Sequence, residues 1–221
     1  MDKTITFDDI RNNNEINTYI ESADEYLKSI GYTEHSFKHV LRCVAVVEYI
    51  LKTLEYDEHT ITLAKIAAYM HDIGNVINRD DHAKSGAIMA FRLLDKLGME
   101  VKDIATIISA IGNHDESSAY PVNVISSALI IADKTDVRRA RVRKDIANFG
   151  IHDRVNYAAE SSRVIIDKEN KILTLKLDVD TTICSIMDYF EIFLSRMMLC
   201  KKACEFFQLE FKLLINDQSL L

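Results

Sequence analysis

The sequence predicts a mostly α-helical protein with a small α+β extension at its C-terminal end. The chain of 221 residues has one proline, six glycines and no tryptophan, a composition that favours long helices over short strands. Apolar residues recur at helical spacing over most of residues 14–132, whereas residues 163–215 include segments that alternate as strands do. We therefore expect a helical domain at residues 1–150 and an extension at residues 151–221, packed together as one unit.

Composition and charge exclude several classes of protein. A hydrophobic fraction of 48% is enough for a full core, and the net charge of −7 argues against general nucleic-acid binding, which needs a basic surface. The four cysteines form no C-x-x-C pair, and no apolar run approaches the ~20 residues that a membrane span needs. The first fifteen residues are too acidic and polar for a secretory or transit peptide. We expect a cytoplasmic protein without membrane contact.

The first two sizeable helices are predicted at residues 14–30 and 34–54. Gly31 is the expected stop of the first helix, and the second carries His39 on the same face as its apolar residues. A lone histidine on such a face is usually a satisfied core residue, so His39 indicates a site only in combination with others. His35, one turn earlier, is the competing choice.

The next predicted helix, residues 58–72, ends in the adjacent pair His71 and Asp72. Neighbouring residues on a helix point about 100° apart, so two adjacent side chains reach one metal ion only where the helix ends. Gly74 is expected to provide that end by adopting the left-handed conformation. Taken alone, the pair is better explained as an imidazole favoured by the helix dipole beside a solvated carboxylate.

Three more candidate ligands lie at or near helix ends. They are His82, which opens a helix over residues 82–97, His114, which follows a helix over residues 101–111, and Asp133, the first charged residue on the helix predicted over residues 124–132. The last of these helices is apolar nearly all round, which implies burial. Since burying a bare carboxylate is costly, Asp133 is expected to be paired or bound to a metal ion.

Together these residues form the pattern H…HD…H…H…D, and residues 34–145 resemble the HD-domain superfamily of metal-dependent phosphohydrolases. Glu34-His35-Ser36-Phe37-Lys38-His39-Val40-Leu41-Arg42 resembles the family's first-histidine segment, in which an arginine follows the histidine by three residues. Arg42 has this spacing from His39, which selects His39 over His35. Two further segments carry the resemblance: His82-Ala83-Lys84-Ser85-Gly86-Ala87 resembles the H-x-x-x-G-A segment of two-metal members, and Ile131-Ala132-Asp133-Lys134 resembles the closing A-D segment. The resemblance implies an HD-domain helical bundle with phosphohydrolase activity.

Two departures from the family pattern narrow the range of expected substrates. Asn75 stands where many relatives have lysine, and the Gly-Tyr-Pro motif of cyclic-dinucleotide phosphodiesterases is missing. The resemblance therefore implies a small phosphorylated or nucleotide substrate rather than a cyclic dinucleotide.

The ligand types predict two divalent ions at one centre. Imidazole and carboxylate suit Fe, Mn, Zn, Co or Ni, and the lack of sulfur ligands argues against a structural zinc site. Six protein ligands are too many for one catalytic ion with an open position, so we expect two ions that share Asp72, the central catalytic residue. His39, His71 and Asp133 complete one shell in this interpretation, and His82 and His114 the other. A water between ions ~3.5–4 Å apart becomes a hydroxide that attacks phosphorus.

A basic stretch follows the last candidate ligand. Residues 134–144 hold six of the chain's 27 lysines and arginines, in a protein that is otherwise acidic. Any single arginine there fits a solvated helix face, but the cluster is better explained as a phosphate clamp. The residues we select for it are Lys134, Arg139, Arg141 and Arg143. Asp115 and Glu116 have the chemistry to protonate a leaving alkoxide or hold a water, although loop acids are more often solvated.

The C-terminal extension is predicted as a short antiparallel sheet and one long helix. A hairpin is expected at residues 163–167 and 171–178, a helix at 182–207, and a strand at 209–215. The apolar stripe of the helix fits core packing or the seam of a homodimer. Two rival functions stay open: a di-iron HD-type oxygenase, which uses the same ligands, and a non-catalytic nucleotide-binding module.

Overall fold

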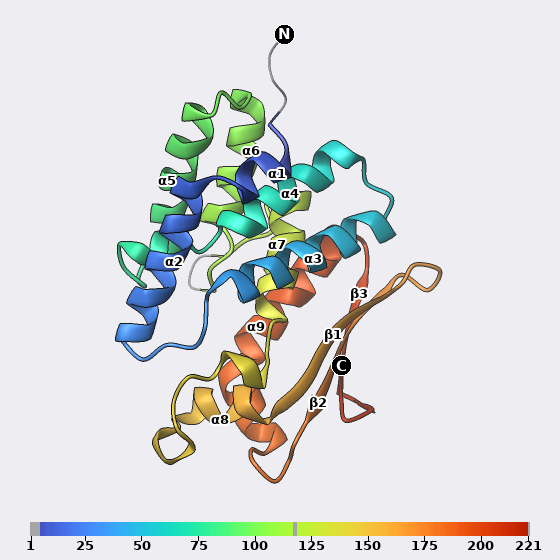
Figure 1. Cartoon of the computed structure of the whole chain (residues 1–221). Coiled ribbons are helices and arrows are strands. Elements are labelled where there is room, and N and C mark those ends of the chain that lie inside the picture. Colours follow the sequence, from blue (N-terminus) through green and yellow to red (C-terminus); the bar gives the residue numbers. More distant parts are fainter. Residues whose placement is uncertain (1–4, 117–118, 221) are drawn as a thin grey trace.

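The structure is a computed structural model that describes residues 5–116 and 119–220 (Figure 1). The extreme ends of the two predicted domains, residues 1–4 and 221, lie outside this range. The helical part comprises α1 (Phe7–Arg11), α2 (Asn14–Ser29), α3 (Phe37–Thr53), α4 (Glu58–Met70), the 3-10 helix η1 (Ile73–Val76), α5 (His82–Lys96), α6 (Val101–Gly112) and α7 (Val124–Lys134). Among the described helices, none is both long and apolar enough to cross a membrane.

The C-terminal part combines helices with a small sheet. It comprises η2 (Arg139–Arg141), η3 (Ile146–Asn148), α8 (Ile151–Ala158), β1 (Ala159–Asp167), β2 (Ile172–Val179), α9 (Ile186–Phe206), β3 (Glu210–Ile215) and β4 (Gln218–Ser219). The predicted fold class, a helical bundle followed by a small sheet and one long helix, is confirmed. Helices α1 and α8 were not predicted, because helices of five and eight residues are too short for a clear periodic pattern.

Side-chain caps fix where the main helices begin. The side chain of Asn13 accepts a hydrogen bond from the backbone of Ile16 at the start of α2, and Asp57 caps α4 in the same way. The helix predicted to begin at residue 34 begins at Phe37, because the Ser36 side chain caps it. Each such cap stabilises the folded state by about 1 kcal/mol.

Two apolar cores share one helix. The first lies among α2 to α7, and the second lies between α9 and the sheet. Helix α7 contributes Leu129 to the first core and Ile130 and Ile131 to the second, which explains why it is apolar nearly all round. In Figure 1, α9 runs beside α7 and separates the bundle from the strands. The division at residue 150 stays a prediction.

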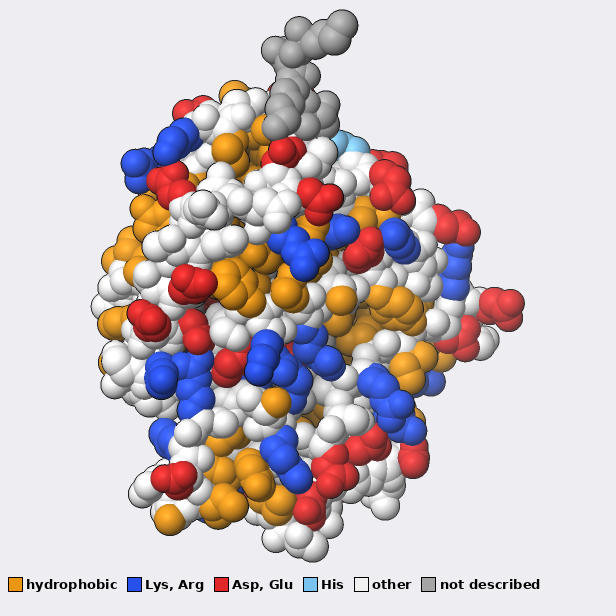
Figure 2. Space-filling view, in the orientation of Figure 1, with side chains coloured by type: hydrophobic (Ala, Val, Ile, Leu, Met, Phe, Trp, Pro, Cys, Tyr) orange, Lys and Arg blue, Asp and Glu red, His pale blue; other side chains and the backbone are white. Residues whose placement is uncertain are grey.

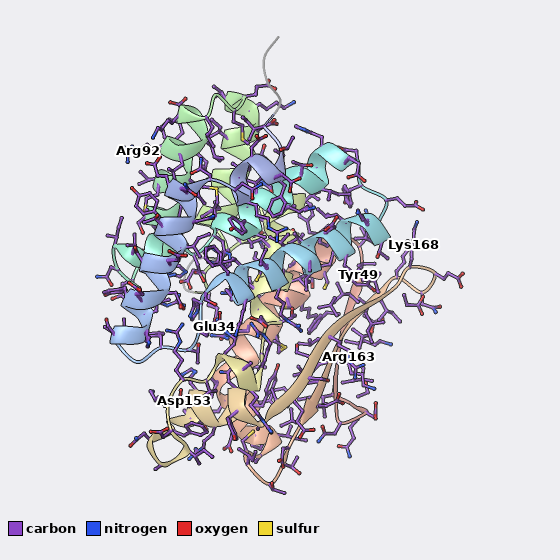
Figure 3. The ribbon with its side chains drawn as sticks, in the orientation of Figure 1. Glu34, Tyr49, Arg92, Asp153, Arg163 and Lys168 are labelled. Carbon is purple, nitrogen blue, oxygen red and sulfur yellow. The ribbon has the colours of Figure 1, made fainter. Side chains whose placement is uncertain are left out.

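The sheet has the order β1-β2-β3-β4 and is mixed. β1 pairs with β2 and β3 pairs with β4 in antiparallel register, as expected for hairpins, but β3 runs parallel to β2. The purely antiparallel sheet that we predicted is therefore wrong. The long α9 crosses over between β2 and β3 and returns the chain to the start of β2, so the two strands run in the same direction. Tyr49 of α3 accepts a hydrogen bond from Ile166 N over 3.1 Å and ties β1 to the bundle (Figure 3).

Gly74 positions η1 against the start of α5. The left-handed conformation predicted for it is wrong, since the described glycines with positive φ are Gly31 and Gly98. A Cβ at position 74 would lie 2.0 Å from His82 O and 2.4 Å from Gly86 N. Glycine is needed here for close approach of two backbones, not for a helix stop. This contact brings the end of α4 next to the start of α5.

Candidate metal centre

Two histidines and a second aspartate gather on one side of Asp72. His39 comes from α3, His71 is the C-terminal cap of α4, and Asp133 lies in the last turn of α7. Oδ2 of Asp72 lies 3.6 Å from His39 Nε2 and 3.3 Å from His71 Nε2. Oδ1 of Asp133 lies 3.3 and 3.8 Å from the same two nitrogens. Two nitrogens and two carboxylate oxygens thus converge on one point.

The other carboxylate oxygen of Asp72 faces the remaining two histidines. His82 is the first residue of α5, and His114 follows α6. Their Nε2 atoms lie 3.4 and 3.9 Å from Oδ1 of Asp72 and 3.2 Å from each other. A single carboxylate therefore presents one oxygen to each histidine pair. The structure brings together all six residues that the sequence selected as ligands.

Hydrogen bonds fix the orientation of every imidazole in this cluster. Three Nδ1–H groups donate to backbone carbonyls: His71 to Ala68 over 2.8 Å, His82 to Arg79 over 2.9 Å, and His114 to Ile111 over 2.6 Å. The fourth, on His39, donates to Oδ2 of Asp136 over 2.8 Å. Because a carbonyl oxygen only accepts, each of the first three Nδ1 atoms carries the proton. The lone pairs of the Nε2 atoms then point into the cluster, as in metal-binding histidines.

This arrangement fits a bound cation. When the imidazoles are neutral, they and the ionised carboxylates turn only acceptors toward one another, and a bound cation removes the resulting repulsion. Burial lowers the pKa of His114 to about 3, with further lowering by His71. Burial would raise the pKa of Asp72, but the neighbouring His71 holds that pKa well below its usual range. Ligands at ~2.1 Å from one ion lie roughly 3.0–3.4 Å apart, close to the separations found here.

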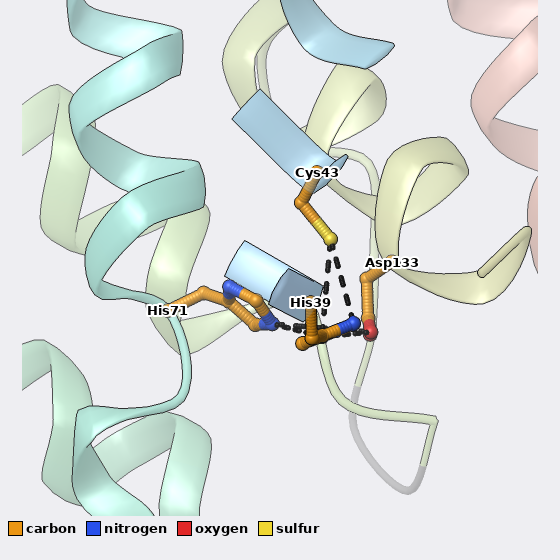
Figure 4. Close-up of side chains that lie close together, drawn as sticks. All are labelled: His39, Cys43, His71 and Asp133. Carbon is orange, nitrogen blue, oxygen red and sulfur yellow. Dashed lines mark hydrogen bonds and ion pairs between the residues drawn. The ribbon is translucent and has the colours of Figure 1, made fainter. Parts of the chain in front are cut away.

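Cys43 adds a sulfur atom beside the cluster. Its Sγ lies 3.9 Å from Nδ1 and 3.8 Å from Nε2 of His39 (Figure 4). Cys43 Sγ, together with atoms of His39, His71 and Asp133, forms a group that could hold a metal ion, and these donors suit borderline transition-metal ions.

Asp136 is a buried residue at this centre that the sequence analysis missed. Besides His39, its carboxylate binds Arg42 Nε over 2.9 Å and Arg138 Nε over 2.6 Å. Burial would raise the pKa of Asp136, but Arg141 and His39 lower it below its usual range. The signal in the sequence was its spacing, three residues after Asp133 and directly past the end of α7. The arginine that follows His39 in the motif thus binds the carboxylate that orients His39.

A cavity of about 320 Å³ adjoins the cluster and is lined by Asp72, His82 and Asp133. Lys134 and Arg141, two residues of the predicted phosphate clamp, line it as well. The structure does not bring Arg139 and Arg143 there. Arg139 donates to Tyr157 O over 2.7 Å, and Arg143 binds the Asp24 side chain. The sequence pattern alone could not separate these two roles.

The cavity also receives side chains that the sequence analysis did not select. Arg79, in the loop before α5, lines it and donates to Asn75 Oδ1 over 3.2 Å. His35 lines it too, with its Nδ1 bound to Thr33 O over 2.7 Å. On the face shown in Figure 2, Lys and Arg side chains gather between the bundle and α8, interleaved with acidic groups. Basic side chains are therefore clustered on this face of an acidic protein.

The two loop acids after His114 also lie at this site. Asp115 Oδ1 is 3.9 Å from His82 Nε2 and 3.9 Å from Arg79 Nη2. Glu116 Oε1 lies 3.8 Å from Lys134 Nζ and also binds Arg196 of α9. Both acids are held in ion pairs, which link the loop to α5, α7 and α9.

Comparison with known proteins identifies relatives of this chain. A family model described as the HD domain matches residues 36–141, which include all six residues around Asp72. Uncharacterized protein MJ1020 of Methanocaldococcus jannaschii is 24% identical over 170 residues, covering 66% of this chain and 65% of that protein, so less than two thirds of its length is spanned. A predicted HD superfamily hydrolase from an uncultured Thermotogales bacterium is 26% identical, with a TM-score of 0.45, over 56% of this chain and 67% of that chain.

Proposed function

The chain belongs to the HD domain family through residues 36–141, and on that premise we propose that it is a metal-dependent phosphohydrolase with a two-ion centre. The observation that carries the proposal is the position of Asp72, whose two carboxylate oxygens face different histidine pairs. His39, His71 and Asp133 hold one divalent ion in this proposal, and His82 and His114 hold the other. Asp72 bridges the two. Such ions, when bound, acidify water and polarise a phosphoryl oxygen.

The residues beside the cluster support a phosphorylated substrate. Lys134, Arg141 and Arg79 line the same cavity as Asp72 and bring three positive charges to it. Guanidinium and ammonium groups bind phosphate oxygens through charge-assisted hydrogen bonds. Arg141 is held by Glu34 O and Asp136 O, each over 2.9 Å, so its position is set before a substrate binds. We propose that these cations orient the phosphoryl group next to Asp72.

Metal analysis and a substrate panel test the proposal. The purified protein, after reconstitution with Mn, Fe, Co, Ni or Zn, is expected to hold about two ions per chain and to hydrolyse p-nitrophenyl phosphate or a nucleotide. Asp72→Ala should lose both ions, whereas His114→Ala should retain one. Equal metal loss in the two variants would contradict the bridging role, and a fully active Asp72→Ala variant would exclude the mechanism.

The same experiment separates the rival functions. Turnover that requires iron and O2 and leaves phosphoesters intact would favour the oxygenase, whose ligand set is identical. Tight nucleotide binding that needs the metal but yields no product would favour the binding module. The cations of the cavity, which include Arg79, Lys134 and Arg141, favour the hydrolase, because oxygen activation does not require a phosphate clamp.

A further inference from the structure

Part of the cavity wall comes from outside the matched HD domain. Helix α8 contributes Asp153 and Asn156 to the cavity that also contains Asp72. Figure 3 shows Asp153 on α8, below the helical bundle. The C-terminal extension therefore completes the site rather than only packing against it. A volume of about 320 Å³ lies at the small end of the range for ligand sites, which begins at roughly 300 Å³.

The two side chains lie one turn apart on α8 and therefore share a face of the helix. Both are polar and nearly inaccessible, with exposed fractions of 4% for Asp153 and 7% for Asn156. Asp153 accepts through Oδ2 from Gly150 N over 3.0 Å and from Lys144 Nζ over 2.8 Å. Asn156 donates through Nδ2 to His152 O over 2.9 Å. In the bonds described for these two residues, the Oδ1 atom of each takes no part.

We propose that Asp153 and Asn156 form an acceptor subsite for hydroxyl groups on the leaving half of the substrate. The inference rests on the proposed phosphohydrolase function and extends it to the substrate. Both residues line the cavity, and a carboxylate or amide oxygen there can accept hydrogen bonds from the hydroxyl groups of a ligand. The substrate class is then a phosphate ester of a sugar or of a ribose-bearing molecule.

The charges at the subsite argue against a second phosphate. The carboxylate of Asp153 repels an anion, and the ammonium group of Lys144 is already paired with it. Of the other cations that line the cavity, Arg79, Lys134 and Arg141 come from the matched domain that carries Asp72. Arg196 of α9 also lines the cavity and is paired with Glu116. A ligand with one phosphate and one hydroxylated end matches this division of charge.

Binding of phosphonates tests the subsite, because their C–P bond resists hydrolysis. Isothermal titration of the metal-loaded protein compares methylphosphonate with the 5-phosphonate analogue of ribose. The ribose analogue is expected to bind the wild type about 10-fold tighter or more, and Asn156→Ala should reduce this preference by roughly 2- to 10-fold, the effect of one neutral hydrogen bond. Asp153→Asn should reduce it further, and Arg154→Ala, an exposed residue of the same helix, should leave it unchanged.

The outcomes separate the subsite from the catalytic proposal. Equal affinities in the wild type, no binding of either phosphonate, or an unchanged preference in both variants would overturn the subsite. If p-nitrophenyl phosphate is nevertheless hydrolysed, the phosphohydrolase function stands and only the subsite is wrong. If the ribose preference is present and lost in Asn156→Ala while no ester is hydrolysed, the subsite stands and the catalytic proposal fails. A hexose 6-phosphonate in the same titration distinguishes a hexose from a ribose.

Discussion

Nδ1 of His39 donates to Oδ2 of Asp136 over 2.8 Å, and both side chains are buried. His39 is the one histidine of the cluster that is oriented by a carboxylate, since the other three donate to backbone carbonyls. A carboxylate makes the opposite nitrogen of the ring a stronger base and a better metal ligand than a carbonyl does. The arginines around Asp136 keep it ionised for this role.

We expect Asp136→Asn to weaken the ion held by His39 more than the ion held by His82 and His114. Loss of such a partner lowers metal affinity by roughly 10- to 100-fold. Competition with a chromophoric chelator would show one of two sites weakened and the other nearly unchanged. The matched control is Asp103→Asn, which breaks a surface pair between Asp103 and His59 of 3.0 Å. Uniform weakening of both sites would contradict the assignment.

The candidate ligands could be predicted from the sequence because their positions follow local rules. His39 lies on an apolar helix face, and His71 and His82 lie where helices end or begin. Such placements depend on helical periodicity and caps, which a sequence displays directly. The motif spacing of the HD family then indicated that candidate ligands far apart in the chain belong to one site.

The remaining parts of the site depend on contacts that no local pattern encodes. Arg141 and Arg143 are two residues apart and look alike in the sequence, yet only Arg141 reaches the cavity. Asp153 and Asn156 come to it only because α8 is positioned beside η2 and α9. The parallel pairing of β3 likewise depends on the path of α9. Tertiary packing determines which arginine reaches the cavity, where α8 lies and how β3 pairs.

Replacing Gly74 should disturb the second histidine pair. In Gly74→Ala the new Cβ would lie 2.0 Å from His82 O, so η1 and α5 must move apart. Such overpacking costs about 1–3 kcal/mol, and we expect a lower Tm together with weaker binding of the ion held by His82. Gly112→Ala is the control, because its Cβ would meet Ala87 at an ordinary 3.6 Å. A Gly74→Ala protein with wild-type Tm and metal content would show that the contact is not needed.

Substitutions of two arginines should distinguish a role in phosphate binding from a role in stability. Arg79→Gln removes a cation from the cavity, and we expect kcat/KM for phosphoesters to fall about 10-fold or more, with a weaker dependence on salt. Arg143→Gln removes an ion pair with Asp24 outside the cavity, so it should change Tm rather than kcat/KM. Steady-state kinetics at two ionic strengths measures both effects. If Arg143→Gln instead lowers kcat/KM and Arg79→Gln changes only Tm, then Arg143 belongs to the phosphate clamp and Arg79 does not.

The exposed face of α9 predicts a homodimer. Met187, Leu194 and Met198 are 73%, 50% and 45% exposed, and their spacing of seven and four residues places them on one side of the helix. Exposed apolar side chains on one side of a surface helix are typical of an interface. Light scattering coupled to size exclusion should therefore give twice the chain mass, and Leu194→Glu should shift the protein to a monomer. Ile88→Glu on α5, where Ile88 is 71% exposed, is the control and should leave the mass unchanged. A wild-type monomer at high protein concentration would exclude this interface.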